Sequence, residues 1–206
     1  MLGELNDKQL DAVNIILSNA TRLKKLIGDL LNAHKLELGK MYFEQKEINV
    51  NDLLENINLS FNYTAKEKNI TIQFHVDENV GIITSDRDRI EQVITNLVYN
   101  AIDFIPKDTG KIEISVKKLD SLIQFEIQDN GISKEKQKQL FSKLYQADTS
   151  TTRKHGGTGL GLSICKGIIE NLGGIIAVDS VENAGSKFYF TIPISKNELP
   201  DESSAN

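Results

Sequence analysis

This chain of 206 residues has one cysteine and no long apolar segment. A single cysteine, Cys165, excludes an internal disulfide and a cysteine metal cluster. Its place in an apolar segment with helical spacing predicts a core residue rather than a reactive thiol. No apolar run reaches the roughly 18 residues of a membrane span, and residues 1–5 lack the features of a secretory signal. The net charge of -5 gives no sign of nucleic-acid binding. These absences favour a globular domain in a reducing, intracellular setting.

The N-terminal segment, residues 4–38, has the spacing of one long amphipathic helix. Asp7 is its expected N-terminal cap and Gly39 its expected stop. An apolar stripe about six turns long cannot stay exposed in water. No other segment has a similar length, so we expect this helix to pair with a second copy of itself or with a helix of a partner. The stripe repeats in steps of three and four residues, with Lys24 as its one polar interruption, at Leu10, Val13, Leu17, Ala20, Lys24, Ile27 and Leu31.

From residue 42 on, strand patterns and helix patterns alternate. Adjacent hairpins, rather than repeated strand–helix–strand units, predict an α+β fold: a mixed sheet with helices packed on one face. Asn51 is the expected cap of one helix, and Ser85 or Asp86 of the next. The expected strands cover residues 44–50, 70–76, 82–84, 111–118, 121–128, 175–180 and 187–194, and the expected helices residues 51–68, 88–104, 133–145 and 162–172.

A glycine-rich turn over residues 156–161 runs directly into the last predicted helix. Glycine lets the backbone approach a ligand closely, and the N–H groups of a helix start favour an anion. The turn therefore predicts a phosphate-binding loop, although such a turn can also be purely structural. It lacks the Lys-Ser/Thr ending of a P-loop, and no strand precedes it, so the NTPase and dinucleotide motifs do not fit.

Asn96 and Asn100 are four residues apart and project from one face of a predicted helix. An amide oxygen can ligate a hard cation such as Mg²⁺. Since asparagine is a poor helix former, two of them on one stripe point to a polar partner. The alternative is a solvated helix face.

Asp129, Asn130 and Gly131 end an alternating apolar strand. Such a triplet usually marks a turn. A carboxylate at a strand end can also accept a hydrogen bond from the exocyclic amino group of adenine. Both interpretations stay open at this point.

Taken in order, these stretches resemble the N, G1, F and G2 boxes of the sensor histidine kinase ATP-binding domain. Its superfamily includes DNA gyrase, mismatch-repair and heat-shock chaperone ATPases. The four boxes match residues 96–101, 129–131, 140–144 and 157–162. The resemblance implies a Bergerat-type ATP-binding sandwich, preceded by one long amphipathic helix that resembles the second dimerisation helix of these kinases.

The same resemblance implies a role for each matching residue. Asp129 would hold the adenine amino group, with a water near Ser186. Asn100 would coordinate Mg²⁺, and Asn96 would contact a phosphate or that ion. The glycine N–H groups would bind phosphates under a lid over residues 133–156. The implied ATP-binding residues are Asn96, Asn100, Asp103, Phe104, Asp129, Gly131, Ile132, Arg153, Lys154, Gly157, Thr158, Gly159, Leu160, Gly161, Leu162 and Ser186.

Asn96 distinguishes a kinase from a hydrolase. Gyrase-type relatives carry a glutamate there, which can serve as general base for water, whereas an amide cannot take a proton. The resemblance thus implies a protein histidine kinase that transfers the γ-phosphoryl group of ATP to a histidine. Two departures favour the alternative of a non-catalytic nucleotide-binding or dimer-scaffold module. The G1 box lacks its second glycine after Gly131, and Asp103 stands where the family often has lysine.

No histidine fits the phosphoacceptor motif. His34 has no acidic neighbour after it, His75 is predicted on the surface of a strand, and His155 falls on the lid. We therefore expect a fragment with a dimerisation helix (residues 1–40), an ATP-binding domain (41–195) and a frayed tail (196–206). The implied partners are ATP or ADP, the phosphoacceptor helix, a response regulator receiver domain and, in the full protein, a second copy. The implied location is a cytoplasmic domain of a protein that can be membrane-anchored.

Overall fold

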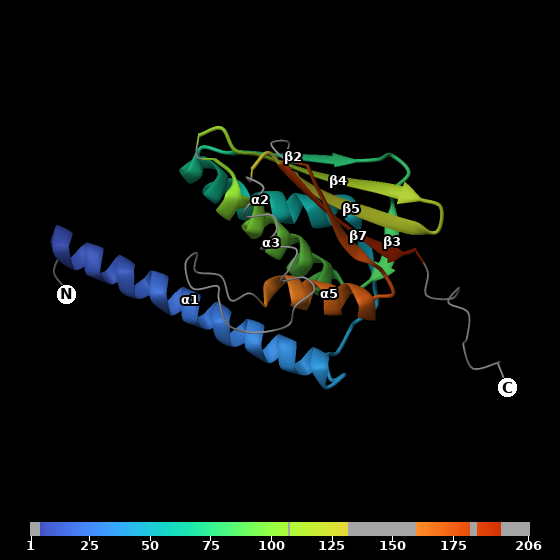
Figure 1. Ribbon diagram of the computed structural model, residues 1–206, viewed down its shortest axis with the longest axis horizontal. Coiled ribbons are helices and arrows are strands. Elements are labelled where there is room, and N and C mark those ends of the chain that lie inside the picture. Colours follow the sequence, from blue (N-terminus) through green and yellow to red (C-terminus); the bar gives the residue numbers. More distant parts are fainter. Residues whose placement is uncertain (1–4, 107, 132–159, 182–184, 195–206) are drawn as a thin grey trace.

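The computed structural model describes residues 5–106, 108–131, 160–181 and 185–194 (Figure 1). They form an α+β domain with one long helix beside it, which confirms the predicted fold class. The predicted helix over residues 133–145 and the tail 196–206 lie outside the described residues. The elements are α1 (Asp7–Glu37), β1 (Lys46–Asn49), α2 (Val50–Lys68), β2 (Thr71–Val76), β3 (Ile82–Ser85), α3 (Arg87–Phe104), β4 (Lys111–Leu119), β5 (Leu122–Asp129), α5 (Gly161–Asn171), β6 (Ile176–Val181) and β7 (Gly185–Pro193).

The cap of α1 differs from the prediction. Asn6, not Asp7, precedes the first helical residue: its side chain accepts the Gln9 N–H at 3.0 Å, and the Gln9 side chain accepts the Asn6 N–H at 3.0 Å. This capping box satisfies two groups that the helix start leaves unpaired. Asp7 instead lies in the first turn, where its charge favours the positive end of the helix. The predicted stop is confirmed, since Gly39 has a φ of +61°.

The caps of α2 and α3 follow the same principle. The predicted cap of α2, Asn51, is wrong, because Asn49 accepts the Asn51 and Asp52 N–H groups and starts the helix earlier. Of the two candidates for α3, Asp86 is the cap and accepts the Arg89 N–H at 3.0 Å. For α1 and α2 the sequence pointed to a polar residue one or two positions after the true cap, whereas for α3 the true cap was one of the two candidates.

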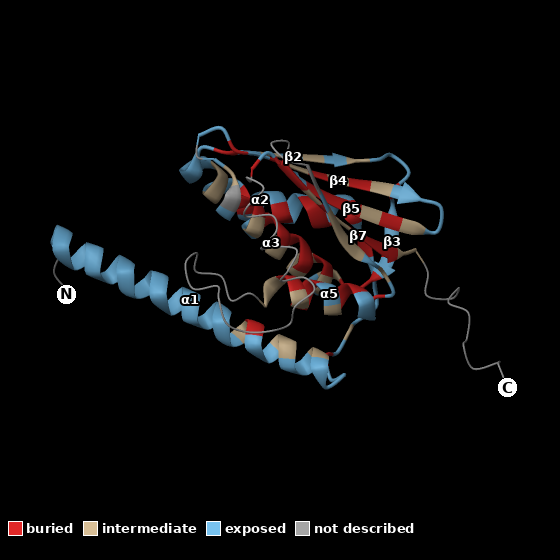
Figure 2. Cartoon of the chain, viewed as in Figure 1, coloured by how far each residue is buried: buried red, intermediate tan, exposed pale blue. Residues whose placement is uncertain are grey.

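Helix α1 has a docked part and an exposed part (Figure 2). Its C-terminal part contacts α5, where a Cβ on Gly167 would lie 2.9 Å from Leu36. The Lys25 ammonium is 5.1 Å from the Tyr99 ring centroid of α3, and Asp29 is buried. The sequence did not predict this intramolecular contact. None of the described helices is both long and apolar enough to cross a membrane. The apolar side chains that stay exposed on α1 include Leu10, Val13, Ile16, Leu17, Leu23, Ile27, Leu30 and Leu31.

The main sheet has the strand order β2-β4-β5-β7-β6. Strands β2 and β4 are parallel, and the other neighbours are antiparallel. The predicted hairpin joins β4 to β5 through Asp120, whose φ of +49° makes the tight turn. Strands β1 and β3 pair separately, with Ile48 opposite Ile83. Helices α2, α3 and α5 lie on one face of the main sheet, as predicted (Figure 1).

The core lies between this sheet and its helices (Figure 2). Alternate residues of the central strands point toward the helices. Apolar residues therefore occupy about every second position in the sequences of these strands. Phe125 of β5 and Phe190 of β7 stack with their ring centroids 4.8 Å apart. The largest fully buried side chains come from β1, α2, α3, β4, β5 and β7. They are those of Ile48, Leu53, Ile57, Ile90, Ile94, Leu97, Ile112, Ile114, Ile123, Phe125, Ile127 and Phe190.

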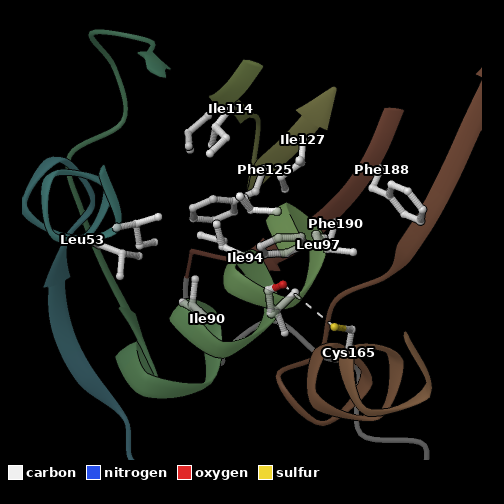
Figure 3. Close-up of a cluster of buried hydrophobic side chains, with 14 of the residues drawn as sticks. Leu53, Ile90, Ile94, Leu97, Ile114, Phe125, Ile127, Cys165, Phe188 and Phe190 are labelled. Carbon is white, nitrogen blue, oxygen red and sulfur yellow. Dashed lines mark hydrogen bonds between the residues drawn. The ribbon is translucent and has the colours of Figure 1, made fainter. Parts of the chain in front are cut away.

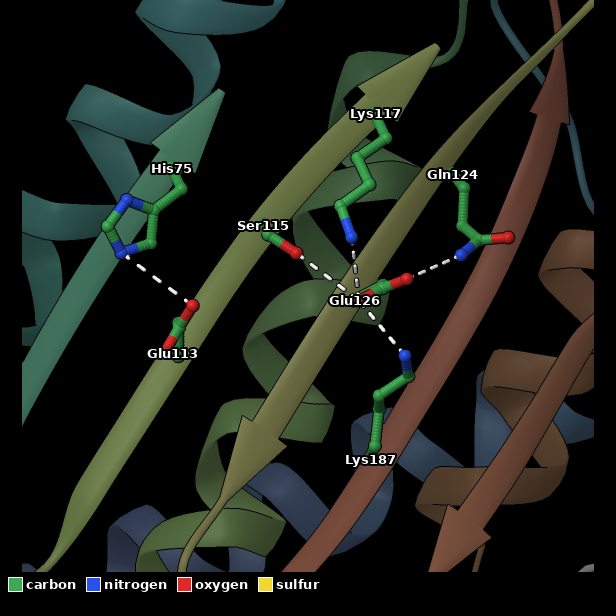
Figure 4. A network of polar contacts seen from close by, with 7 residues as sticks. All are labelled: His75, Glu113, Ser115, Lys117, Gln124, Glu126 and Lys187. Carbon is green, nitrogen blue, oxygen red and sulfur yellow. Dashed lines mark hydrogen bonds and ion pairs between the residues drawn. The ribbon is translucent and has the colours of Figure 1, made fainter. Parts of the chain in front are cut away.

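The opposite face of the sheet carries a network of polar side chains (Figure 4). Glu126 is its centre: the Lys187 and Lys117 ammonium groups are 3.2 and 3.6 Å from its Oε2, and the Gln124 amide donates to its Oε1 at 2.6 Å. Burial disfavours the carboxylate, but the Lys187, Gln124 and Lys117 contacts outweigh it and hold the pKa of Glu126 below its usual range.

We expect Glu126→Gln to lower the free energy of unfolding by about 1 kcal/mol at pH 7, because both lysines lose their charged partner. The stabilisation from a depressed pKa is present above the unfolded value of 4.5 and is lost as the pH falls through the lower folded value. Urea unfolding of both proteins at pH 7 and pH 3.5 measures this. A difference that grew toward low pH would contradict it.

Candidate functional site

Asp129 is a buried carboxylate at the end of β5. Its Oδ1 accepts the Gly131 N–H at 2.8 Å and the Ser186 N–H at 3.4 Å, and the residue is 3% exposed. Burial raises the pKa of Asp129 to about 6, because these two N–H groups offset only part of the cost of removing a carboxylate from water. No described residue donates a hydrogen bond to Oδ2. One oxygen of a costly buried carboxylate is thus left for a donor.

Ser186 lies opposite Asp129 in the pairing of β5 with β7. Its hydroxyl is buried and has no hydrogen-bond partner among the described residues, whereas buried polar atoms are normally paired. Gly185 has a φ of +96°, and a Cβ there would lie 1.7 Å from the carbonyl oxygen of Asp129. Glycine at this position lets β7 begin close against the end of β5. The result is a carboxylate and a hydroxyl on adjacent strands, with no described residue bonded to the hydroxyl.

Asn130 holds the turn after β5 in place. Its Oδ1 accepts the Lys111 N–H at 2.7 Å, and its Nδ2 donates to the Thr109 carbonyl at 2.9 Å. Both ends of the amide are therefore bound to the segment that leads into β4. Asn130 is a structural residue that fixes where Asp129 lies.

The two predicted amides, Asn96 and Asn100, are half-buried on α3. The Asn96 amide donates from Nδ2 to the Cys165 sulfur of α5 at 3.8 Å. One turn before Asn96, the Gln92 amide accepts from Arg89 at 2.9 Å. Asp103 is exposed. This stripe presents amide groups, which can either donate to an anion or ligate a hard cation.

Helix α5 begins at Gly161 without a side-chain cap. The first N–H groups of a helix have no partner within it, and together with the helix dipole they favour an anion. Leu162 is 7% exposed and packs into the core, so only its backbone is available to a ligand. The apolar residues that follow anchor the helix and hold this start in place.

Helix α3 connects these parts, because it contacts both β5 and α5. Figure 3 shows Ile94 and Leu97 of α3 between Phe125 of β5 and Cys165 of α5. The end of β5, the amide stripe of α3 and the start of α5 therefore belong to elements that pack on one another. Together they offer a carboxylate, amides and backbone N–H groups, a set that matches the amino group, the metal-bound phosphates and the anionic charge of a purine nucleotide.

The described residues include nine of the predicted ATP-binding residues: Asn96, Asn100, Asp103, Asp129, Gly131, Leu160, Gly161, Leu162 and Ser186. The others, namely Ile132, Arg153, Lys154, Gly157, Thr158, Gly159 and the side chain of Phe104, lie outside the described part.

Two residues that shape this region had no predicted functional role. Cys165 is a fully buried core residue, as predicted, but it also bonds to Asn96. Gly185 holds the start of β7 against Asp129. The only signal for Gly185 is its place in a turn before the last strand, and the contact of Cys165 depends on packing between helices that no local pattern reveals.

A depression of about 330 Å³ lies elsewhere, between the C-terminal half of α2 and the start of β2. It is lined by Asn58, Phe61, Asn62, Ala65, Lys66, Asn69, Ile70, Thr71 and Ile72, none of which is a predicted ATP-binding residue. The chemistry of Asp129, Asn96 and Asn100, rather than the size of a hollow, therefore defines the candidate site.

Residues 85–196, more than half of the chain, match the family model described as histidine kinase-, DNA gyrase B-, and HSP90-like ATPase. The chain belongs to this family. The match begins at Ser85, the last residue of β3, and its range includes every predicted ATP-binding residue. Family membership makes this part an ATP-binding domain and confirms the predicted resemblance.

The relatives within the family are sensor kinases. The chain is 31% identical to the autoinducer 2 sensor kinase/phosphatase LuxQ of Vibrio vulnificus over 96% of its length and 24% of that of LuxQ. It is 35% identical to the signal transduction histidine-protein kinase BarA of Escherichia coli over 94% of its length and 22% of that of BarA. The chain thus spans about a quarter of the curated relatives that it matches.

A solved structure supports the same family placement. The histidine kinase ThkA, in complex with the response regulator protein TrrA, superposes with a TM-score of 0.70 at 30% identity. The match covers 96% of this chain and 55% of the ThkA chain. It includes the long N-terminal helix as well as the ATP-binding domain.

Proposed function

We propose that this chain is the ATP-binding catalytic part of a two-component sensor histidine kinase and transfers the γ-phosphoryl group of ATP to a histidine. The observation that supports this most strongly is the buried Asp129 carboxylate, whose Oδ2 lies beside the Ser186 hydroxyl and, like that hydroxyl, has no hydrogen-bond donor or acceptor among the described residues. A buried, incompletely bonded carboxylate costs stability, which is typical of a functional group.

Asp129 would accept the 6-amino group of adenine at Oδ2. The buried hydroxyl of Ser186, which faces the same strand end, would bind a ring nitrogen through a water or donate directly. The N–H groups of Gly131 and Ser186 would keep the carboxylate in place through Oδ1. The base is thereby selected by a donor–acceptor pattern that guanine, with a carbonyl at that position, does not match.

Asn100 would ligate Mg²⁺ through its amide oxygen, which suits a cation that takes few protein ligands and fills its coordination with phosphates and water. When bound, Mg²⁺ neutralises phosphate charge. The first N–H groups of α5 would bind the same phosphates from the other side. In this arrangement Asn96, an amide, gives the site no general base for water, so transfer to histidine is favoured over hydrolysis.

We expect Asn100→Ala to remove most of the gain in ADP affinity that Mg²⁺ provides, about tenfold, and to leave the affinity in EDTA unchanged. Calorimetric titrations with and without Mg²⁺ measure both. Asn56→Ala is the matched control, because Asn56 is an exposed helical asparagine whose side chain, among the described residues, bonds only to the Asp52 carbonyl of its own helix. Equal losses with and without Mg²⁺ would reject the metal-ligand role.

The partners proposed for the protein are a phosphoacceptor helix of the same protein, a response regulator receiver domain and a second copy of the chain. The exposed apolar stripe of α1 supports pairing with another helix. We keep the division into a dimerisation helix (residues 1–40), an ATP-binding domain (41–195) and a tail (196–206) as part of this proposal. The proposed location is a cytoplasmic domain of a protein that can be membrane-anchored.

Phosphotransfer to a purified two-helix hairpin that carries a phosphoacceptor histidine tests the kinase function. With γ-labelled ATP, the hairpin is expected to gain an acid-labile, alkali-stable label. Release of free phosphate without labelling would identify a hydrolase. Nucleotide binding with neither outcome would favour the non-catalytic module. Asp103 and the G1 box without its second glycine are the features that support this alternative.

A further inference from the structure

Cys165 of α5 makes two hydrogen bonds to residues of α3. Its sulfur lies 3.9 Å from the Val93 carbonyl oxygen, to which the thiol donates, and it accepts from Nδ2 of Asn96 at 3.8 Å. The side chain is fully buried, and burial raises the pKa of the thiol to about 12. The sulfur therefore keeps its proton at neutral pH.

These bonds determine whether Nδ2 or Oδ1 of the Asn96 amide faces Cys165. A thiol has one proton, and the Val93 carbonyl can only accept, so the proton points to Val93. Toward Asn96 the sulfur can then only accept, which requires the NH₂ end of the amide. The carbonyl end, Oδ1, is consequently turned away from Cys165. If a donor stood in place of the Val93 carbonyl, the thiol proton would be free to point to Asn96, and either end of the amide could face the sulfur.

We infer that Cys165 is a positioning residue that holds the Asn96 amide with Oδ1 toward the nucleotide, so that this oxygen acts on Mg²⁺ or on its bound water. A carbonyl oxygen and a phosphate oxygen are both acceptors and cannot bond to each other. An amide oxygen is suited to a hard cation and to the water that it binds. This inference rests on the proposed function, and it assigns the Oδ1 end of Asn96 to the ion, one of the two contacts that the family resemblance left open for this residue.

Cys165→Ala frees the amide to turn, so it is expected to lower the Mg²⁺-dependent gain in ADP affinity about fivefold, in line with the loss of one orienting hydrogen bond. The affinity in EDTA is expected to stay within about twofold of that of the unchanged chain. Cys165→Ser keeps a donor and an acceptor and is expected to restore most of the gain. Ile168→Val, which also shortens a buried side chain of α5, is the control for packing. Calorimetry on the 206-residue chain gives these affinities.

The same substitution in an Asn96→Ala background shows whether Cys165 acts through Asn96. There, Cys165→Ala is expected to have no further effect on the Mg²⁺-dependent gain. An equal loss in both backgrounds, or an equal loss with and without Mg²⁺, would overturn the positioning role in favour of packing.

Side-chain amide NMR of the nucleotide-free chain tests the orientation independently of nucleotide binding. The Nδ2 protons of Asn96 are expected to shift in Cys165→Ala and to stay near their original positions in Ile168→Val. Unchanged Asn96 signals in Cys165→Ala would overturn the inference. Failure of the unchanged chain to bind Mg-ADP would instead reject the proposed function, and the NMR result would still decide the orientation of the amide.

Discussion

Asp129→Asn is expected to weaken ADP binding about 30-fold or more and, at the same time, to stabilise the nucleotide-free chain at neutral pH. The loss of affinity follows because the amide would present its NH₂ group where Oδ2 now accepts, so two donors would face each other. A hydrogen bond to a charged group contributes about 1.5–3 kcal/mol. The substitution keeps an oxygen for the Gly131 and Ser186 N–H groups, so the strand end is preserved.

The gain in stability follows from the pKa of Asp129, which burial raises from 3.8 to about 6. The folded state thus binds the proton more tightly than the unfolded state does. The stabilisation that this proton provides is complete below about pH 3.8 and is lost as the pH rises through about 6. At pH 7 the buried carboxylate costs up to about 3 kcal/mol of folding free energy. Asparagine removes that cost because it carries no charge.

Urea unfolding across the pH range measures this trade-off. Asp129→Asn should raise the free energy of unfolding at pH 7 and differ little from the unchanged chain at pH 4. Glu126→Gln is the matched control, because it also neutralises a buried carboxylate, but one with a lowered pKa, and should destabilise instead. A chain that Asp129→Asn left less stable at pH 7 would contradict the account of Asp129 as a costly functional carboxylate.

Gly185→Ala is expected to have the largest effect on stability, more than about 3 kcal/mol, and to abolish nucleotide binding. The φ of +96° is unfavourable for any side chain, and the added Cβ would lie 1.7 Å from the Asp129 carbonyl oxygen and 2.8 Å from its carbon. Both atoms belong to the backbone, so the strands have to separate. The separation moves Asp129 away from Ser186.

Gly81→Ala is the control for this substitution, because no atom lies within 4 Å of a Cβ at that position. It is expected to change the free energy of unfolding by less than about 0.5 kcal/mol. Thermal unfolding and ADP titration of both variants measure the contrast. If Gly185→Ala bound ADP normally, the close approach of β7 to β5 would not be what positions Asp129.

Local patterns predicted most of the elements because each strand and helix buries one face. The alternation in β4 and β5 and the helical spacing of α3 survive in the structure, since the core lies along those faces. The caps were less predictable. Asn49 and Asn51 are both good capping residues, and the choice between them depends on where the chain leaves β1.

Contacts between segments that are far apart in the sequence could not be predicted from local sequence patterns. Nothing in the sequence indicates that α1 would dock on α5, with Leu36 over Gly167, because that contact depends on how two separate helices are oriented. Ser186 was placed beside Asp129 only through the family resemblance, and the β5–β7 register is what brings them opposite each other. The bond between Asn96 and Cys165 joins residues 69 positions apart.

Comparing ADP with inosine diphosphate tests most directly whether Asp129 binds the adenine amino group. The two nucleotides differ at the position where Asp129 would accept, since inosine has a carbonyl there. The unchanged chain is expected to bind ADP at least about tenfold more tightly than inosine diphosphate, and Asp129→Ala is expected to remove this preference. Equal affinity of the unchanged chain for both nucleotides, measured by calorimetry at pH 7.5, would contradict the proposed role of Asp129.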